Sequence, residues 1–228
     1  MRHLNIYKLN IVLIISLILI SCNNEKVEIS TKALYNEELR PQFHFSPKEN
    51  WTNDPNGMVY YKGTYHLFFQ HNPVGINWGN MTWGHSVSSD MVHWEELEDA
   101  IMPDELGTIF SGTATVDWNN SAGFQVGDEK TIVASYTYCG SCEQFGDPGP
   151  DEPFTQAIAY STDGGKTFTK YSGNPVLENI AGGGDRDPKV FWHEPTQNRG
   201  PCLRYPSPCS TLEAPAKSPG SGNSTHDH

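Results

Sequence analysis

Asp54 is the side chain whose neighbours best suit it to nucleophilic chemistry. It precedes Pro55 within the run Trp51–Gly57, and a residue before a proline is disfavoured in the helical region. Pro55, Asn56 and Gly57 then supply a fixed φ, a side chain that bonds its own backbone, and tolerance of positive φ. We therefore expect a rigid corner that presents the Asp54 carboxylate for attack on a carbon electrophile. The alternative is a hairpin turn whose aspartate only caps backbone amides.

Two later stretches carry polar side chains in similar settings. Phe110–Gly112 and Arg186–Pro188 each form a predicted turn beside strand-like sequence. In the second stretch, the Arg186 guanidinium would keep the Asp187 carboxylate ionised and could itself bind a hydroxyl group. Taken alone, an adjacent arginine and aspartate are better explained as a surface ion pair. The functional interpretation therefore depends on the three stretches occurring together.

Together, the three stretches resemble the N-terminal part of glycoside hydrolase family 32, the invertases, levanases and inulinases that cleave β-fructofuranosides. The opening motif of this family is Trp-x-Asn-Asp-Pro-Asn-Gly, and only its variable second position, Thr52, is free to differ. The resemblance extends from about Pro41 to about Thr196. It implies an enzyme that hydrolyses sucrose, levan or inulin by a retaining double displacement and uses no cofactor.

The resemblance also implies roles for individual side chains. Retaining hydrolysis needs two carboxyl groups about 5 to 5.5 Å apart, one to attack the anomeric carbon and one to protonate the leaving oxygen. Asp54 matches the nucleophile of the family, and Asp187 matches its transition-state stabiliser. The positions that match contacts to the fructosyl unit are Asn53, Gln70, Trp78, Ser111 and Arg186.

The general acid of the family has no counterpart that the sequence identifies. In the family it is a glutamate in a Glu-Cys or similar motif, well downstream of Arg-Asp-Pro. Glu194 lies only seven residues past Asp187, in what should be the same hairpin, and Glu213 lies in a stretch without strand patterning. We assign neither of them as the acid.

The elements that must position these residues are predicted to be short β-strands. Turn residues recur about every 8 to 12 residues, as in sandwiches, barrels and propellers. Two Ser-x-Asp turns, ending at Asp90 and Asp163, indicate repeated four-stranded blades.

The resemblance implies a five-bladed β-propeller with the active site in its central funnel, usually followed by a β-sandwich. At 228 residues the chain is too short for both. The expected fold is therefore all-β, a partial five-bladed β-propeller with its first blades only and without the C-terminal β-sandwich. The expected strands are 58–61, 65–70, 83–88, 113–116, 131–136, 156–161 and 166–170.

Residues 1–22 are predicted to be a lipoprotein signal peptide. A positively charged start precedes the apolar run Ile11–Ile20, which is shorter than the roughly 20 residues needed to span a bilayer. Leu19–Cys22 resembles a bacterial lipobox, with cleavage before Cys22 and lipid attached to its thiol. The alternative is an ordinary signal peptide with an incidental cysteine. Residues 23–40 would form a polar tether, which predicts a lipid-anchored protein of the bacterial cell envelope, facing the periplasm or the surface.

Residues 41–197 are assigned to the partial propeller, and residues 198–228 to a disordered tail. The tail is rich in proline, serine and glycine and contains no Ile, Val, Phe or Trp, so no strand alternation continues through it. We hypothesise that it is translated out of frame or reflects a truncated gene. The alternative is a genuine low-complexity tail. Without a general acid and the later blades, the chain as written is expected to be inactive.

Charge and cysteine content limit the partners. The net charge of −12 argues against nucleic acid, which needs a basic face, and is compatible with a neutral sugar. Cys139 and Cys142 could form a disulfide, remain free thiols or supply half of a zinc site. The further zinc ligands would be Cys202 and Cys209, whose spacing is wrong. A disulfide or free thiols are favoured, and no metal site is predicted.

A non-catalytic fructan-binding lipoprotein is the competing function. Trp51, Trp78 and Trp83 would also serve an aromatic binding surface. A propeller enzyme of the neighbouring clan that acts on arabinan or galactan is a further alternative, against which the Trp51–Gly57 run argues. Leaving-group contacts in the family come largely from later blades, so the choice among sucrose, levan and inulin stays open.

Overall fold

A computed structural model describes residues 35–140, 142, 153–179, 184–193 and 198–204. The chain divides into two units, residues 1–36 and 37–228, and only Tyr35 and Asn36 of the first are described. The second unit carries the fold. The predicted signal peptide, Cys22 and the tail beyond residue 204 lie outside the described residues. None of the described residues forms a helix long and apolar enough to span a bilayer.

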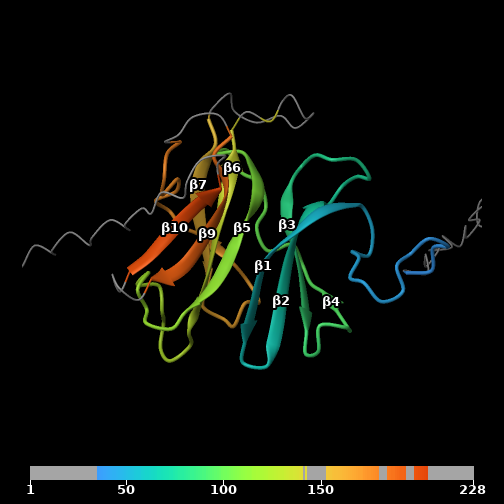
Figure 1. Cartoon of the computed structure of the whole chain (residues 1–228), viewed down its shortest axis with the longest axis horizontal. Coiled ribbons are helices and arrows are strands. Elements are labelled where there is room, and N and C mark those ends of the chain that lie inside the picture. The colour runs from blue at the N-terminus through green and yellow to red at the C-terminus, as the bar shows by residue number, and fades with distance from the viewer. Residues whose placement is uncertain (1–34, 141, 143–152, 180–183, 194–197, 205–228) are drawn as a thin grey trace, which may run out of the picture. The chain divides into compact units, whose positions relative to one another are not determined.

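The first sheet is a four-stranded antiparallel meander in the order β1-β2-β3-β4 (Figure 1). Its strands are β1 (Trp51–Tyr61), β2 (Thr64–Asn72), β3 (Thr82–Ser88) and β4 (Glu95–Glu96). The β1–β2 hairpin turns at Lys62 and Gly63, as the sequence predicts. Both residues have positive φ, a conformation whose twist matches that of paired strands. This two-residue turn fixes the pairing of the strand that carries Asp54.

The second sheet repeats this topology in the order β5-β6-β7-β8. Its strands are β5 (Thr108–Asp117), β6 (Thr131–Cys139), β7 (Thr155–Ser161) and β8 (Thr169–Lys170). The two Ser-x-Asp turns follow β3 and β7, the third strand of each sheet. Asp90 N–H donates to Ser88 Oγ in one turn (3.1 Å), and Ser161 Oγ donates to Asp163 Oδ1 in the other (2.7 Å). Their equivalent positions support two copies of one four-stranded unit.

A third, two-stranded sheet consists of β9 (Arg186–His193) and β10 (Asn198–Arg204), which pair antiparallel. The structure thus places residues 198–204 in a strand, within the stretch that the sequence assigned to a disordered tail. The described residues contain antiparallel sheets and no helix, in agreement with the predicted all-β class.

The main core lies between the two four-stranded sheets. Trp83 of β3 is fully buried there and packs edge-on against Tyr136 of β6, with 6.2 Å between ring centroids. Its Nε1 donates to the Phe110 carbonyl oxygen at 2.9 Å, which satisfies the indole inside the core. Strand β5 lies against both β1 and β9. The first strands of the three sheets are therefore neighbours in the order β1, β5, β9.

Candidate active site

Each of the three motifs lies at an irregularity in the first strand of its sheet. Asp54 lies in a register shift of β1 against β2, Ser111 is the extra residue in a shift of β5 against β6, and Asp187 lies in a shift of β9 against β10. Such bulges bend a strand and re-aim a side chain, and they are common next to active sites.

The predicted turns at these motifs are wrong in one respect, because the motifs lie within strands. The rigid corner expected at Asp54 is a bulge rather than a chain reversal. Pro55 is tolerated inside β1 because β1 is the edge strand of its sheet, where a missing N–H leaves no ladder bond unmade. The turn residues of the motif thus produce a kink and not a loop.

Gly112 explains why glycine follows Ser111. A Cβ atom at Gly112 would collide with the carbonyl oxygen of Ser135 on β6. The two backbones can approach this closely only without a side chain at that position. The glycine thereby permits the bulge that points Ser111 out of the regular β5–β6 ladder.

A hydrogen bond joins Asp54 to the second sheet. Ser111 Oγ donates to Asp54 Oδ2 at 3.0 Å. Ser111 is buried and Asp54 is exposed, so the serine can orient one carboxylate oxygen while the group stays accessible to a ligand.

Asp187 lies at the start of β9, half-buried and next to an exposed arginine. The Nε atom of Arg186 is 3.8 Å from Asp187 Oδ2. The Asp187 backbone N–H donates to Thr137 Oγ1 on β6 at 3.1 Å. The carboxylate is thus paired with a cation, and its backbone is attached to the neighbouring sheet.

One pocket of about 720 Å³ brings Asp54, Ser111 and Asp187 together. Its polar lining also includes Asn56, Thr113 and Lys189. Among the described residues that line it there is no glutamate. The pocket therefore offers two carboxylates, one ammonium group, two hydroxyl groups and an amide. Such a set suits a small ligand rich in hydroxyl groups.

The other predicted sugar contacts do not line this pocket, and neither does Arg186. Asn53 Oδ1 accepts a hydrogen bond from Trp51 Nε1 at 2.9 Å. Gln70 is buried in β2, and its Nε2 has no hydrogen-bond partner among the described residues. Trp78 packs against a second apolar cluster near the end of β6. The roles of these residues as contacts to a fructosyl unit stay predictions.

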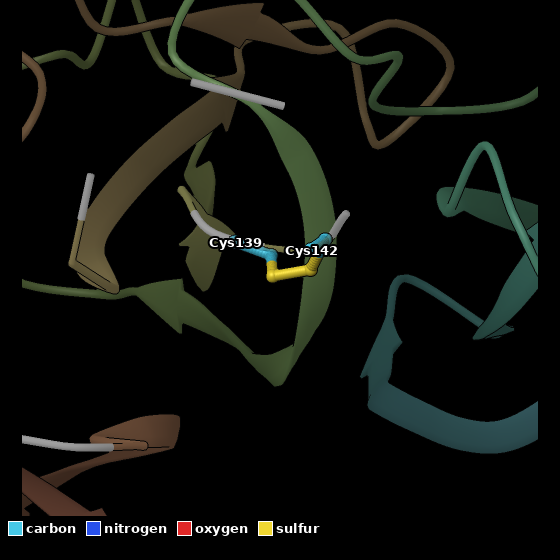
Figure 2. The surroundings of a disulfide bond; sticks show 2 residues. All are labelled: Cys139 and Cys142. Atoms are coloured by element: carbon cyan, nitrogen blue, oxygen red, sulfur yellow. A yellow bond between two sulfur atoms is a disulfide. The ribbon is translucent and has the colours of Figure 1, made fainter. Parts of the chain in front are cut away.

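Cys139 and Cys142 are joined by a disulfide (Figure 2). Both are fully buried and form the second apolar cluster with Phe154, against which Trp78 and Phe110 pack. Of the alternatives that the sequence left open, the structure has the disulfide. Among the described residues, no group of three or more potential metal ligands comes together.

The match to a family model decides the family of the chain. A model described as the glycosyl hydrolases family 32 N-terminal domain matches residues 44–200. This chain belongs to glycoside hydrolase family 32. The resemblance carried by the three motifs is thereby confirmed.

Individual family 32 proteins are similar to the chain in sequence and in structure. The levanase of Bacillus subtilis is 54% identical over 167 residues, which cover 73% of this chain and 23% of the levanase. The crystal structure of an exo-inulinase from Aspergillus awamori aligns with a TM-score of 0.65 and 42% identity, covering 74% of this chain and 36% of that one. The β-fructofuranosidase of Schwanniomyces occidentalis complexed with fructosyl-erythritol aligns with a TM-score of 0.63 and 43% identity, covering 72% and 31%. The chain thus spans about a quarter to a third of these relatives' length.

Several residues at the family 32 site escaped the sequence analysis. Lys189 lies two positions after Asp187, and its place directly after the Arg186–Pro188 stretch is the one signal that could have found it. Thr113 lies two positions after Ser111 and could have been found in the same way. Gln156 begins the predicted strand 156–161, and Thr137 lies one residue past the predicted strand 131–136, where β6 continues; no local signal marks either of them.

Proposed function

We propose that this family 32 protein is a β-fructosidase that hydrolyses sucrose or fructans by a retaining double displacement. The observation that carries the proposal is the single pocket lined by both Asp54 and Asp187. The similar proteins support the substrate class, since they are a levanase, an exo-inulinase and a β-fructofuranosidase complexed with a fructosyl ligand.

Asp54 is proposed as the nucleophile. One oxygen of its carboxylate attacks the anomeric carbon of the fructosyl unit, the bond from that carbon to the leaving oxygen breaks, and a fructosyl–Asp54 ester forms. Ser111 holds Oδ2 through its hydrogen bond of 3.0 Å, so the carboxylate is oriented before the sugar arrives. Water then attacks the same carbon, releases fructose and restores the free carboxylate.

Asp187 is proposed to stabilise the transition state. Positive charge develops on the sugar ring as the leaving group departs, and a carboxylate that accepts hydrogen bonds from sugar hydroxyls binds this state more tightly than the ground state. The leaving oxygen also needs a proton from a general acid, and we assign none among the described residues.

A substrate with an acidic leaving group isolates the chemistry assigned to Asp54 and Asp187. The phenolate of p-nitrophenyl β-D-fructofuranoside departs without protonation, so its release needs the nucleophile and the stabiliser but little help from a general acid. We expect the purified chain, although inactive on sucrose and fructans without that acid, to release this phenolate. Asp54→Asn should lower the rate by at least about 1,000-fold and Asp187→Asn by about 100- to 1,000-fold, each without loss of fold.

Asp128→Asn is the matched control, because Asp128 is exposed in the β5–β6 connection and does not line the pocket. It should match the wild type. Equal rates for the wild type and Asp54→Asn would refute the assigned nucleophile. Binding of levan or inulin without any phenolate release would instead support the competing function, a non-catalytic fructan-binding protein. Sucrose, levan and inulin have alkoxide leaving groups that need a general acid, so the chain as written is expected to release little or no fructose from them.

A further inference from the structure

The backbone at Asp187 has an unusual conformation. Its φ of 59° lies in the left-handed region, which residues other than glycine rarely adopt and which needs support from the surrounding structure. Pairing within its own sheet is interrupted here, because Asp187 lies in the register shift between β9 and β10. Hydrogen bonds to the chain on either side of it come from the neighbouring sheet, β5 to β8.

Three side chains of that sheet, each on a different strand, hold the segment around Asp187. Thr137 Oγ1 on β6 accepts the Asp187 N–H at 3.1 Å. Gln156 Nε2 on β7 donates to the Asp185 carbonyl oxygen at 2.9 Å. Thr113 Oγ1 on β5 donates to the carbonyl oxygen of the proline after Asp187 at 2.8 Å. The segment is therefore fixed at three of its peptide groups.

Thr137 and Gln156 also fix each other. Thr137 Oγ1 donates to Gln156 Oε1 at 2.7 Å. The threonine hydroxyl is therefore the donor in its bond to the glutamine and the acceptor in its bond from the Asp187 N–H. This bond orients the Gln156 amide, because its Oε1 must accept and its Nε2 is then free to donate toward Asp185. Both side chains are almost fully buried, so water cannot replace either of them at low cost.

The backbone of Gln156 is itself fixed. Its N–H donates to the Leu177 carbonyl oxygen at 2.8 Å, and its own carbonyl oxygen accepts from the Val176 N–H at 2.8 Å. The support thus extends from the strand pairs of the second sheet, through two side chains, to the backbone that carries the Asp187 carboxylate.

We infer that Thr137 and Gln156 are positioning residues, which set the place of the Asp187 carboxylate in the pocket that Asp54 also lines. Neither lines the pocket, so each acts through the backbone of Asp187 and not on a ligand. The catalytic consequence rests on the proposed function, whereas the effect on the Asp187 backbone does not. Because a shift of about 1 Å in a reacting group can cost 100-fold in rate, a small relaxation at Asp187 should be measurable.

The test compares substitutions at two buried threonines of the same strand. Thr137→Val removes the acceptor of the Asp187 N–H, and Thr137→Ser keeps it. Thr131→Val is the matched control, since Thr131 is fully buried in β6 and its Oγ1 has no hydrogen-bond partner among the described residues. Gln156→Met removes the bond to Asp185 at similar side-chain length, and it tests the inference if Thr137→Val does not fold.

Amide hydrogen exchange at Asp187 is the first readout, and phenolate release from p-nitrophenyl β-D-fructofuranoside is the second. We expect Thr137→Val and Gln156→Met to speed exchange at Asp187 by at least tenfold. They should lower kcat by about 10- to 100-fold and change KM by less than about threefold, because the ground-state sugar contacts stay in place. Thr137→Ser should restore kcat to within about threefold of the wild type, and Thr131→Val should change neither quantity.

Exchange and turnover at wild-type values in Thr137→Val, or an equal loss in Thr131→Val, would overturn the inference. A loss confined to KM would also overturn it, because it would indicate a binding contact instead of a displaced stabiliser. If the wild type releases no phenolate, the proposed function fails, and the exchange rates at Asp187 still decide whether Thr137 and Gln156 hold this segment.

Discussion

The Ser111–Asp54 hydrogen bond is the contact that ties the candidate nucleophile to a second sheet. Asp54 is exposed on an edge strand, where a carboxylate would otherwise sample several rotamers. The donor comes from a buried residue, so it is fixed by the packing of β5 against β1. A single hydroxyl group thus selects the orientation of the nucleophile.

Replacement of Ser111 by alanine should therefore slow the chemical step. A hydrogen bond to a charged group contributes about 1.5 to 3 kcal/mol, so we expect a fall in kcat of about 10- to 100-fold for phenolate release. Ser86→Ala is the control, because Ser86 is buried in β3 and its Oγ has no hydrogen-bond partner among the described residues. Steady-state kinetics of the two variants provide the comparison. Equal kcat in Ser111→Ala and the wild type would remove Ser111 from the mechanism.

The bulges are the relevant features at the scale of the elements. A regular first strand in each sheet would alternate its side chains between the two faces at a fixed register. The shifts in β1, β5 and β9 break that alternation at the motif residues. Asp54, Ser111 and Asp187 can then converge on one pocket from three sheets.

Gly112→Ala tests whether the β5 bulge depends on the close approach of β5 to β6. The added methyl group would collide with the Ser135 carbonyl oxygen, and a backbone neighbour cannot move aside as a flexible side chain can. We expect a loss of about 1 to 3 kcal/mol in the free energy of unfolding, measured by denaturant titration, and a lower kcat.

Gly75→Ala is the matched control for this substitution. Its added methyl group would meet only the side-chain amide of Asn72, with Nδ2 at 3.3 Å, and it should change stability by less than about 0.5 kcal/mol. If Gly112→Ala were as stable as Gly75→Ala, the steric account of the bulge would be wrong.

At the scale of the whole folded unit, a buried histidine pair lies where the two large sheets pack together. His66 Nδ1 on β2 and His85 Nε2 on β3 are 3.0 Å apart, so one of them donates a shared proton. Phe168, which directly precedes β8 of the second sheet, contacts the His85 ring edge-on, with 6.3 Å between centroids. Burial lowers the pKa of His66, and burial together with the His66 charge lowers the pKa of His85 to about 3.

Acid should therefore destabilise this fold. A lowered pKa in the folded state favours the neutral ring, so the unfolded chain takes up protons first as the pH falls below about 6.5, and stability is lost from there toward pH 3. For His85 alone the loss at pH 5 relative to pH 8 is about 2 kcal/mol. His85→Gln should remove most of this pH dependence, and replacement of the exposed His44 by glutamine should not. Unfolding free energies that change equally with pH in both variants would contradict the account.

Membrane attachment is a separate proposal at the scale of the whole chain. We propose that lipid is attached to Cys22, because the short apolar run ends in Leu19–Cys22. Cells that express the wild type with radiolabelled palmitate should yield a labelled, processed protein. Cys22→Ala should yield an unlabelled precursor, and Cys202→Ala should label normally. Equal labelling of the wild type and Cys22→Ala would end the proposal.

The sequence by itself determined the family and the two carboxylates that line the pocket. Asp54 and Asp187 each stand in a short motif whose residues are specific enough to be recognised without neighbours from other strands. It also determined the β class and the β1–β2 hairpin, because strand alternation and turn chemistry act over a few residues.

Only the tertiary structure decided how the site is assembled. The hydrogen bond from Ser111 to Asp54 spans 57 residues, and the one from Asp187 to Thr137 spans 50. No local pattern indicates such contacts, since they arise from how one sheet packs against the next. The same holds for the bulges, which depend on the register between two strands and not on either strand alone. Residue type and spacing can therefore name the reacting groups, whereas the hydrogen bonds that hold them depend on sheets that meet only in the folded protein.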